Sequence, residues 1–192
     1  MTTSDASSTA PNPTAAAYDA ALAPFSEVVA SVPADAWDAP SPCTEWSTRD
    51  VLGHVMNTER GWLAERGFEL GEAPDLGSDP AAGWRRHVDE VSPIIHDADA
   101  MGAEYESPFG KSTVGAVFER FFVFDLVAHR WDLATGAGLG TTFTDDELET
   151  IEAGIEFFGP HLHADGVCGP AVPVADDADR QTRLLGELGR AA

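Results

Sequence analysis

The chain has 192 residues, of which 43% are hydrophobic, and its 33 acidic and 11 basic residues give a formal net charge of −22. The hydrophobic fraction is sufficient for the core of one domain and argues against a wholly disordered chain. The charge argues against nucleic acid and anionic membranes as partners, because both are negative. Residues 1–17 lack the features of a signal peptide, and no apolar run approaches the roughly 20 residues needed to span a bilayer. We therefore expect a cytoplasmic, acidic protein.

Six segments place apolar residues at the spacing of a helix with a buried face. In chain order, the predicted helices are residues 13–32, 47–67, 80–97, 113–135, 144–158 and 180–188. The 113–135 segment has apolar residues on nearly every side, which indicates a central and largely buried helix.

Two of these helices carry a recognisable start signal. Ser47 with Asp50 and Thr144 with Glu147 have the spacing of capping boxes, in which each side chain bonds the other residue's backbone N–H. Pro93 lies inside the third predicted helix, where it either kinks the helix or ends its regular part.

The run 71–79 is rich in Gly, Pro and Asp and predicts a long connection. Because strand patterns are almost absent, we predict an all-α fold. It is a four-helix bundle with a long crossover between the second and third helices, followed by C-terminal helices. We assign residues 1–13 to a flexible N-terminus and 14–160 to the bundle. Residues 161–192 form a C-terminal tail whose short helix packs on the bundle.

Asp125 and His129 are the first candidate site residues. They lie four apart in a predicted helix, so their side chains share one face, one turn apart. A carboxylate among phenylalanines and valines is costly to bury without a partner, and a cation is such a partner. Carboxylate and imidazole at this spacing commonly supply two metal ligands from one helix.

His54 is the best candidate for a third ligand, because it lies among apolar residues of the second predicted helix. Two histidines and one carboxylate leave a coordination position for water or substrate, as in a reactive site rather than a closed structural one. The alternative is a metal-free polar network in which the same three residues bond each other or the backbone.

The other histidines and Cys43 give weaker signals. His87 and His96 are interpreted as exposed helix residues, and His161 and His163 as solvent-facing loop residues. Cys43 lies just before a predicted helix, where a thiol can become reactive. Packing is the commoner fate of a free cysteine, and we expect it here.

Three segments together resemble a known family. Residues 42–47, PCTEWS, followed by 51–55, VLGHV, resemble the helix 2 signature of the DinB-like superfamily. Residues 125–134, DLVAHRWDLA, resemble the helix 4 signature of one actinobacterial branch, which carries the metal-binding domain of mycothiol-dependent maleylpyruvate isomerase. The tail from 169 to 190 is similar to a closing segment common in that branch. The resemblance spans most of residues 14–190.

This resemblance implies a DinB-like bundle with a divalent metal, zinc, held by one residue of helix 2 and two of helix 4. These positions correspond to His54, Asp125 and His129. The isomerase has glutamate where this chain has Asp125. It also has a separate C-terminal domain, for which this chain has little room, so its specific isomerisation is not transferred.

Two functions follow from these expectations. The first is a metal-dependent transferase or isomerase that uses a thiol cofactor of the mycothiol type, with a small-molecule thiol and its substrate as partners. The second is a non-catalytic metal- or ligand-binding module. Bundles of this kind often pair, so a homodimer is one expected state.

Overall fold

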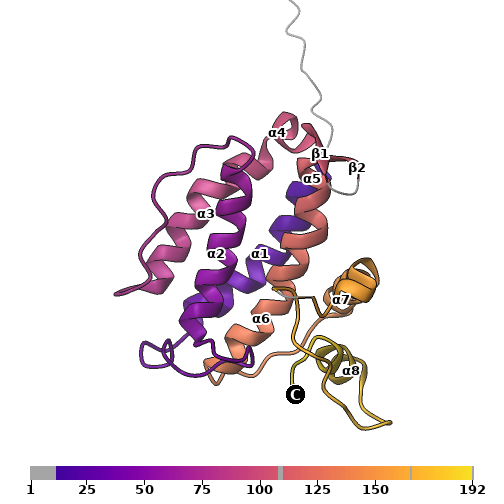
Figure 1. Cartoon of the computed structure of the whole chain (residues 1–192). Coiled ribbons are helices and arrows are strands. Elements are labelled where there is room, and N and C mark those ends of the chain that lie inside the picture. The colour runs from indigo at the N-terminus through magenta and orange to yellow at the C-terminus, as the bar shows by residue number, and fades with distance from the viewer. Residues whose placement is uncertain (1–11, 108–109, 165, 192) are drawn as a thin grey trace, which may run out of the picture.

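The computed structural model describes residues 12–107, 110–164 and 166–191, and these form a mostly helical protein with one two-stranded sheet (Figure 1). The predicted all-α bundle is confirmed. The flexible N-terminus predicted for residues 1–13 falls almost wholly outside the described residues. In chain order, the elements are α1 (Pro13–Ser31), α2 (Thr48–Ala64), α3 (Pro80–His96), α4 (Ala98–Gly102), β1 (Glu104–Ser107), β2 (Gly110–Thr113), α5 (Val114–Val117), η1 (Phe118–Val123), α6 (Phe124–Gly136), α7 (Asp145–Phe158), η2 (Gly159–His161) and α8 (Arg180–Glu187).

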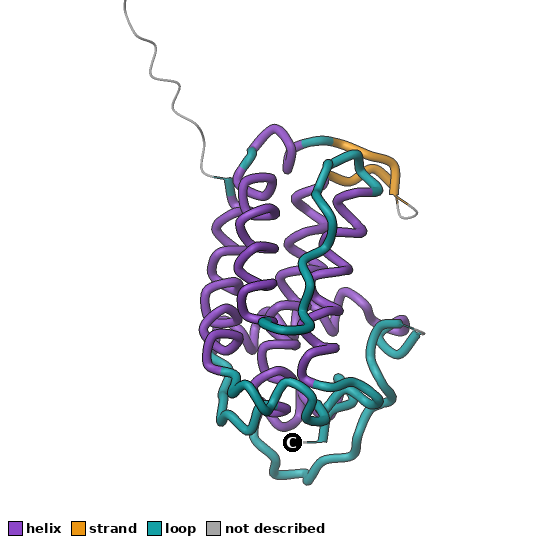
Figure 2. The backbone as a smooth tube through the Cα atoms, turned by 90° about the vertical axis from the view of Figure 1, so that its left-hand side faces the viewer, coloured by secondary structure: helices purple, strands orange, loops and turns teal. Residues whose placement is uncertain are grey.

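Four long helical segments make the bundle: α1, α2, α3 and the continuous rod formed by α5, η1 and α6. Both α1 and α2 pack against α6 and against α3, so α2 and α6 are neighbours. The connection from 65 to 79 runs back along the bundle before α3 begins, and α2 and α3 therefore point the same way (Figure 2). This is the long crossover expected from the sequence. It makes α2 and α6 direct neighbours, so that side chains on their facing sides can form one site.

Both predicted capping boxes are present and fix where two helices begin. Ser47 Oγ accepts from the Asp50 backbone N–H at 3.2 Å, and Asp50 Oδ2 accepts from the Ser47 N–H at 2.9 Å. Thr144 and Glu147 make the same reciprocal pair at 3.3 and 2.8 Å. Each box satisfies two backbone donors that the first turn of a helix leaves unpaired.

In the first half of the predicted helix 113–135, the structure differs from the prediction. Thr113 caps it, but a π-helical segment, Phe118–Val123, lies between α5 and α6. A π-turn accommodates one more residue than an α-turn and so rotates the face that follows it. The sequence did not reveal this change, because apolar residues on every side of a helix do not indicate how the helix is rotated about its axis. The short β1–β2 hairpin, which pairs Tyr105 with Ser112, was also missed.

The core is filled by large side chains from all four bundle segments. Those that are fully buried include Tyr18, Phe25, Leu52, Met56, Leu63, Trp84, Ile95, Phe118, Leu126 and Leu133. Pro93 neither ends nor interrupts α3, which continues to His96. Within the described ranges, no helix is both long and apolar enough to cross a membrane.

The interpretation of His87 as exposed is wrong. The side chain is fully buried, and its Nε2 lies 2.8 Å from Glu59 Oε2. Tyr18 donates its hydroxyl to the same carboxylate at 3.2 Å. Burial raises the pKa of Glu59, against the opposing effect of the His87 contact. Polar residues of three different helices meet here, a pairing that spacing along one helix cannot reveal.

The C-terminal helix α7 packs beside α6 and η1, outside the four-helix bundle (Figure 1). α7 approaches α6 closely because Gly154 has no side chain: a Cβ there would lie 2.1 Å from a ring carbon of Phe124. α8 packs on α7, and the chain then returns to the bundle so that Arg190 is 7% exposed. This return brings the end of the chain to the candidate site.

Candidate metal centre

His54 is held on α2 by the packing of its neighbours. Val51, Leu52 and Val55 on the same helix are buried, which fixes the rotation of α2 about its axis. The Trp46 ring lies 4.7 Å from the His54 ring, between centroids, and covers it from the loop that precedes α2. One quarter of the His54 side chain is exposed, so the site can be reached from solvent.

Asp125 and His129 face His54 from the neighbouring helix. They lie one turn apart on α6, as the i, i+4 spacing predicts. Asp125 Oδ1 is 3.3 Å from His129 Nε2, and Asp125 Oδ2 is 3.5 Å from His54 Nε2. The structure thus brings together all three residues selected from the sequence, and their donor atoms lie within 4.8 Å of one another.

The spacing of these atoms suits a shared cation better than direct bonds. A charge-assisted N–H···O bond is normally about 2.7–2.9 Å long, shorter than either contact here. Ligands bound at about 2.0–2.1 Å to one tetrahedral ion lie roughly 3.3–3.4 Å from each other. The two separations, 3.3 Å from Oδ1 to His129 and 3.5 Å from Oδ2 of the same carboxylate to His54, are each close to that edge length. Two imidazoles and a carboxylate are also a donor set that divalent zinc accepts.

The charges at the site are strongly coupled. Desolvation within the bundle opposes ionisation of Asp125, but the adjacent His129 and His54 rings hold its pKa well below the usual range. Desolvation likewise opposes protonation of His129, whereas the Asp125 and Asp132 carboxylates raise its pKa well above the usual value. Without a cation, His129 therefore keeps a proton at neutral pH, and a cation that binds its Nε2 must displace that proton.

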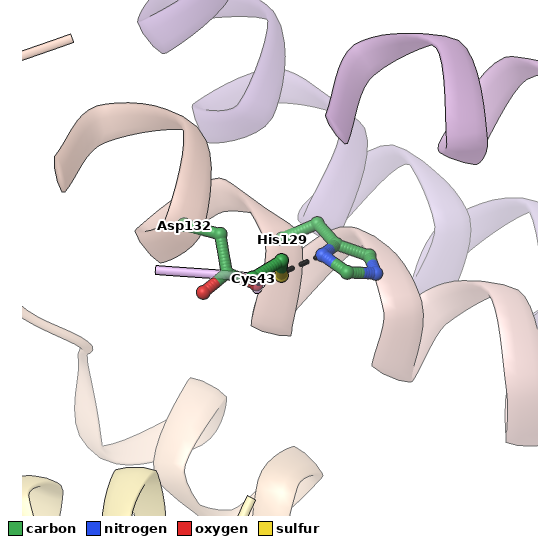
Figure 3. Close-up of side chains that lie close together, drawn as sticks. All are labelled: Cys43, His129 and Asp132. Carbon is green, nitrogen blue, oxygen red and sulfur yellow. Dashed lines mark hydrogen bonds and ion pairs between the residues drawn. The ribbon is translucent and has the colours of Figure 1, made fainter. Parts of the chain in front are cut away.

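Asp132 supports the far side of the His129 ring. Its Oδ2 lies 2.9 Å from His129 Nδ1, and the carboxylate is completely buried on the same face of α6, three residues on (Figure 3). A carboxylate that accepts the Nδ1–H of a metal-binding histidine fixes the tautomer in which Nε2 is free to ligate. Sequence reasoning missed Asp132, although its spacing of three from His129 was a usable signal.

Arg190 in turn holds Asp132. Its Nε donates to Asp132 Oδ1 at 3.1 Å and its Nη2 to Oδ2 at 2.8 Å, a bidentate pair closed to solvent. The neighbouring arginine charge and the His129 contact keep the pKa of Asp132 well below its usual range, against the effect of burial. The last residues of the chain thus anchor the network that orients His129.

Cys43, His129 and Asp132 form a second group whose donor atoms lie within 4.8 Å (Figure 3). Cys43 Sγ is 3.2 Å from Asp132 Oδ2. Both oxygens of that carboxylate already bond the guanidinium of Arg190. A cation placed there would adjoin a fixed positive charge, so we interpret this group as support for His129 rather than as a second metal site.

The remaining histidines lie away from these three residues. His96, His161 and His163 are exposed, as expected. His96 pairs with Asp19 on the surface at 2.9 Å, and His163 Nδ1 lies 2.6 Å from the Gly169 carbonyl oxygen.

Comparison with known proteins identifies a family and two related proteins at the level of sequence. The model of the mycothiol maleylpyruvate isomerase N-terminal domain family matches residues 18–134, a range that contains His54, Asp125, His129 and Asp132. Two uncharacterized proteins from different strains of Mycobacterium tuberculosis are each 31% identical to this chain over 189 residues. Each alignment covers 91% of this chain and 97% of the relative. No solved structure matches the chain.

The family match covers most of the bundle, from within α1 to near the end of α6, and ends before the tail that supplies Arg190. The bundle topology agrees with the DinB-like fold inferred from the sequence. The chain belongs to the family of the mycothiol maleylpyruvate isomerase N-terminal domain.

Proposed function

We propose that this protein binds one divalent metal ion, zinc, through His54, Asp125 and His129, and uses it with a low-molecular-weight thiol of the mycothiol type in a transferase or isomerase reaction. The spacing of the donor atoms carries the proposal. The three residues come from two helices, and both carboxylate-to-imidazole separations are close to the edge of a zinc coordination tetrahedron. The printed name of the family points to mycothiol as the thiol.

The donor set leaves room for an exogenous ligand. Zinc is almost always four-coordinate in proteins, and catalytic sites keep one of the four positions for water or substrate. Three residues therefore leave one position vacant. His54 and Asp125 are about one quarter exposed, whereas His129 is nearly buried, so the open side lies toward His54 and Asp125.

The residues around the site have separate roles in the proposed chemistry. A divalent ion at the site lowers the pKa of a thiol that binds to it, which gives a thiolate at neutral pH. Asp132 holds the Nδ1 proton of His129 and so keeps Nε2 available as a donor. Trp46 covers the His54 ring and, at 6.1 Å between centroids, extends toward the His129 ring, which limits access of water on that side.

Cobalt provides a direct test, because a thiolate bound to Co²⁺ gives a sulfur-to-metal charge-transfer absorption. The Cys43→Ser chain is loaded with Co²⁺ and titrated with mycothiol, with glutathione as the comparison thiol. The substitution removes the nearest protein sulfur, so any new band reports the added thiol. We expect a saturable band with mycothiol. If cobalt binds with His54, Asp125 and His129 intact and no thiol ever gives a band, the thiol-cofactor proposal fails.

The same material separates an enzyme from a non-catalytic module. The metal-loaded chain is assayed for mycothiol S-conjugation with electrophilic substrates, with and without a chelator. Chelator-sensitive turnover supports the enzyme. Thiol binding without turnover on any electrophile favours a metal- and thiol-binding module, the second function expected from the sequence.

A further inference from the structure

Both cysteines of the chain converge on one side chain that the proposed function does not use directly. Cys43 Sγ lies 3.7 Å from Arg190 Nη2, and Cys168 Sγ lies 3.8 Å from Arg190 Nη1. The two sulfurs thus contact the two terminal nitrogens of a single guanidinium. The cysteines are far apart in the sequence: Cys43 precedes α2, and Cys168 lies in the segment before α8. They are the only two cysteines in the sequence.

The backbone around each thiol is fixed by hydrogen bonds. Cys43 lies in a narrow turn closed by the pairing of Pro40 with Ser47, and its carbonyl oxygen accepts from the Trp46 N–H at 3.0 Å. The Cys168 N–H donates to the Leu162 carbonyl oxygen at 3.0 Å. The two cysteines are free thiols in this structure, and both are half-buried rather than fully buried. Small reagents can therefore reach them, and both sulfurs lie against the same guanidinium group.

We propose that Cys43 and Cys168 form a dithiol site that reduces low-molecular-weight disulfides and closes to an intramolecular disulfide. The observation that carries this is the convergence of the two sulfurs on Arg190. Neither cysteine is one of the three proposed metal ligands, and the inference goes beyond the proposed metal-and-thiol function.

The reaction consists of two thiol–disulfide exchanges. The Cys43 sulfur, after losing its proton to solvent, attacks one sulfur of the small disulfide; that S–S bond breaks, and one small thiol leaves and takes up a proton. The Cys168 sulfur then loses its proton and attacks Cys43 Sγ in the mixed disulfide, which expels the second small thiol. Two cysteines are oxidised by two electrons, and one small disulfide is reduced to two thiols.

Burial raises the pKa of the Cys168 thiol, although the Arg190 charge opposes this effect, so Cys168 suits the second, intramolecular step. Closure also has a consequence for the metal centre. Arg190 holds Asp132, and a bond between the sulfurs that flank its guanidinium changes those contacts.

The experiment treats the native full-length chain with an excess of glutathione disulfide, quenches it with an alkylating agent and measures intact and tryptic masses. We expect both free thiols to be lost together, the intact mass to fall by two hydrogens and no glutathione to remain. The tryptic peptides 1–49 and 131–180, which carry the two cysteines, should appear as one cross-linked species. Cys43→Ser and Cys168→Ser each retain a single cysteine, which should carry one glutathione.

The unfolded chain serves as the control for disulfide formation by random contact between the two cysteines. In a denaturant the cysteines are separated by a long flexible loop, so their effective concentration is low. We expect the native chain to form the cross-link roughly tenfold or more faster than the unfolded chain. A native chain that accumulates glutathione on its cysteines without a cross-link would overturn the proposal. So would one that links to a second chain, or one that does not react. No metal enters the measurement, so this result is independent of whether the metal proposal stands.

Discussion

Asp132→Asn tests whether the buried carboxylate orients His129. In the native chain, Asp132 accepts from the His129 ring, the Cys43 thiol and two nitrogens of Arg190. Asparagine keeps one acceptor oxygen and turns an NH₂ group toward one of these donors. The exposed fractions of the Asp132 and Arg190 side chains are 0% and 8%, so solvent cannot compensate.

The structure sets the size of two separate effects. Removing one partner of a buried ion pair costs about 3–5 kcal/mol, because the other charge stays buried. Loss of an outer-shell carboxylate typically lowers metal affinity about 10–100-fold. We therefore expect Asp132→Asn to lower both the free energy of unfolding and the affinity for zinc. Urea titration measures the first quantity, and competition with a chromophoric chelator measures the second.

A second substitution separates the two effects. Asp132→Asn with Arg190→Met removes the uncompensated charge, so most of the lost stability should return, while the weakened zinc affinity should persist. Asp89→Asn, at an exposed position of α3, is the matched control and should change neither quantity. If folded Asp132→Asn binds zinc within about twofold of the native chain, Asp132 does not orient His129.

Four further expected outcomes concern His129, two glycines and His87. Because the pKa of His129 is raised in the metal-free chain, metal binding should release a proton, and affinity should rise about tenfold per pH unit below that pKa. Calorimetry in buffers of different ionisation enthalpy checks this, and zero proton release would contradict it. By the same linkage, the stability that protonated His129 gives the metal-free chain is complete below its unfolded pKa, about 6.5, and is lost as pH rises through the folded value. Gly154→Ala should lower the free energy of unfolding, measured in urea, by about 1–3 kcal/mol, because the added methyl group overpacks against Phe124. Gly61→Ala, with open space around it, should instead stabilise α2 by up to about 1 kcal/mol. Equal effects of the two substitutions would contradict the close contact between α6 and α7. His87→Leu should cost about 3 kcal/mol in the same assay, because it leaves the buried carboxyl group of Glu59 without its His87 partner; an unchanged unfolding midpoint would contradict this.

The parts of the fold that the sequence predicted are those set by local rules. The capping boxes at Ser47 and Thr144 depend on residues three apart, and both are present. The facing of Asp125 and His129 depends only on the helical repeat. His54 required one further inference, that a polar residue among apolar neighbours on α2 faces the adjacent helix.

The parts that were missed depend on contacts between distant segments. Arg190 meets Asp132 across 58 positions of sequence, and His87 meets Glu59 across 28. No periodicity connects such pairs. The π-helical segment before Asp125 was missed for a different reason, since a helix that is apolar on all sides carries no marker of its rotation.

The metal content of the chain, purified without a histidine tag and never exposed to chelator, tests directly whether His54, Asp125 and His129 hold an ion. We expect one divalent ion per chain in the native protein, and loss of that ion in Asp125→Ala and in His129→Ala. The paired substitution His161→Ala with His163→Ala, at exposed loop positions, should leave the content unchanged. If the Asp125→Ala and His129→Ala chains keep full metal content, or if the native chain contains none and takes up none from added zinc, these residues do not form a metal site.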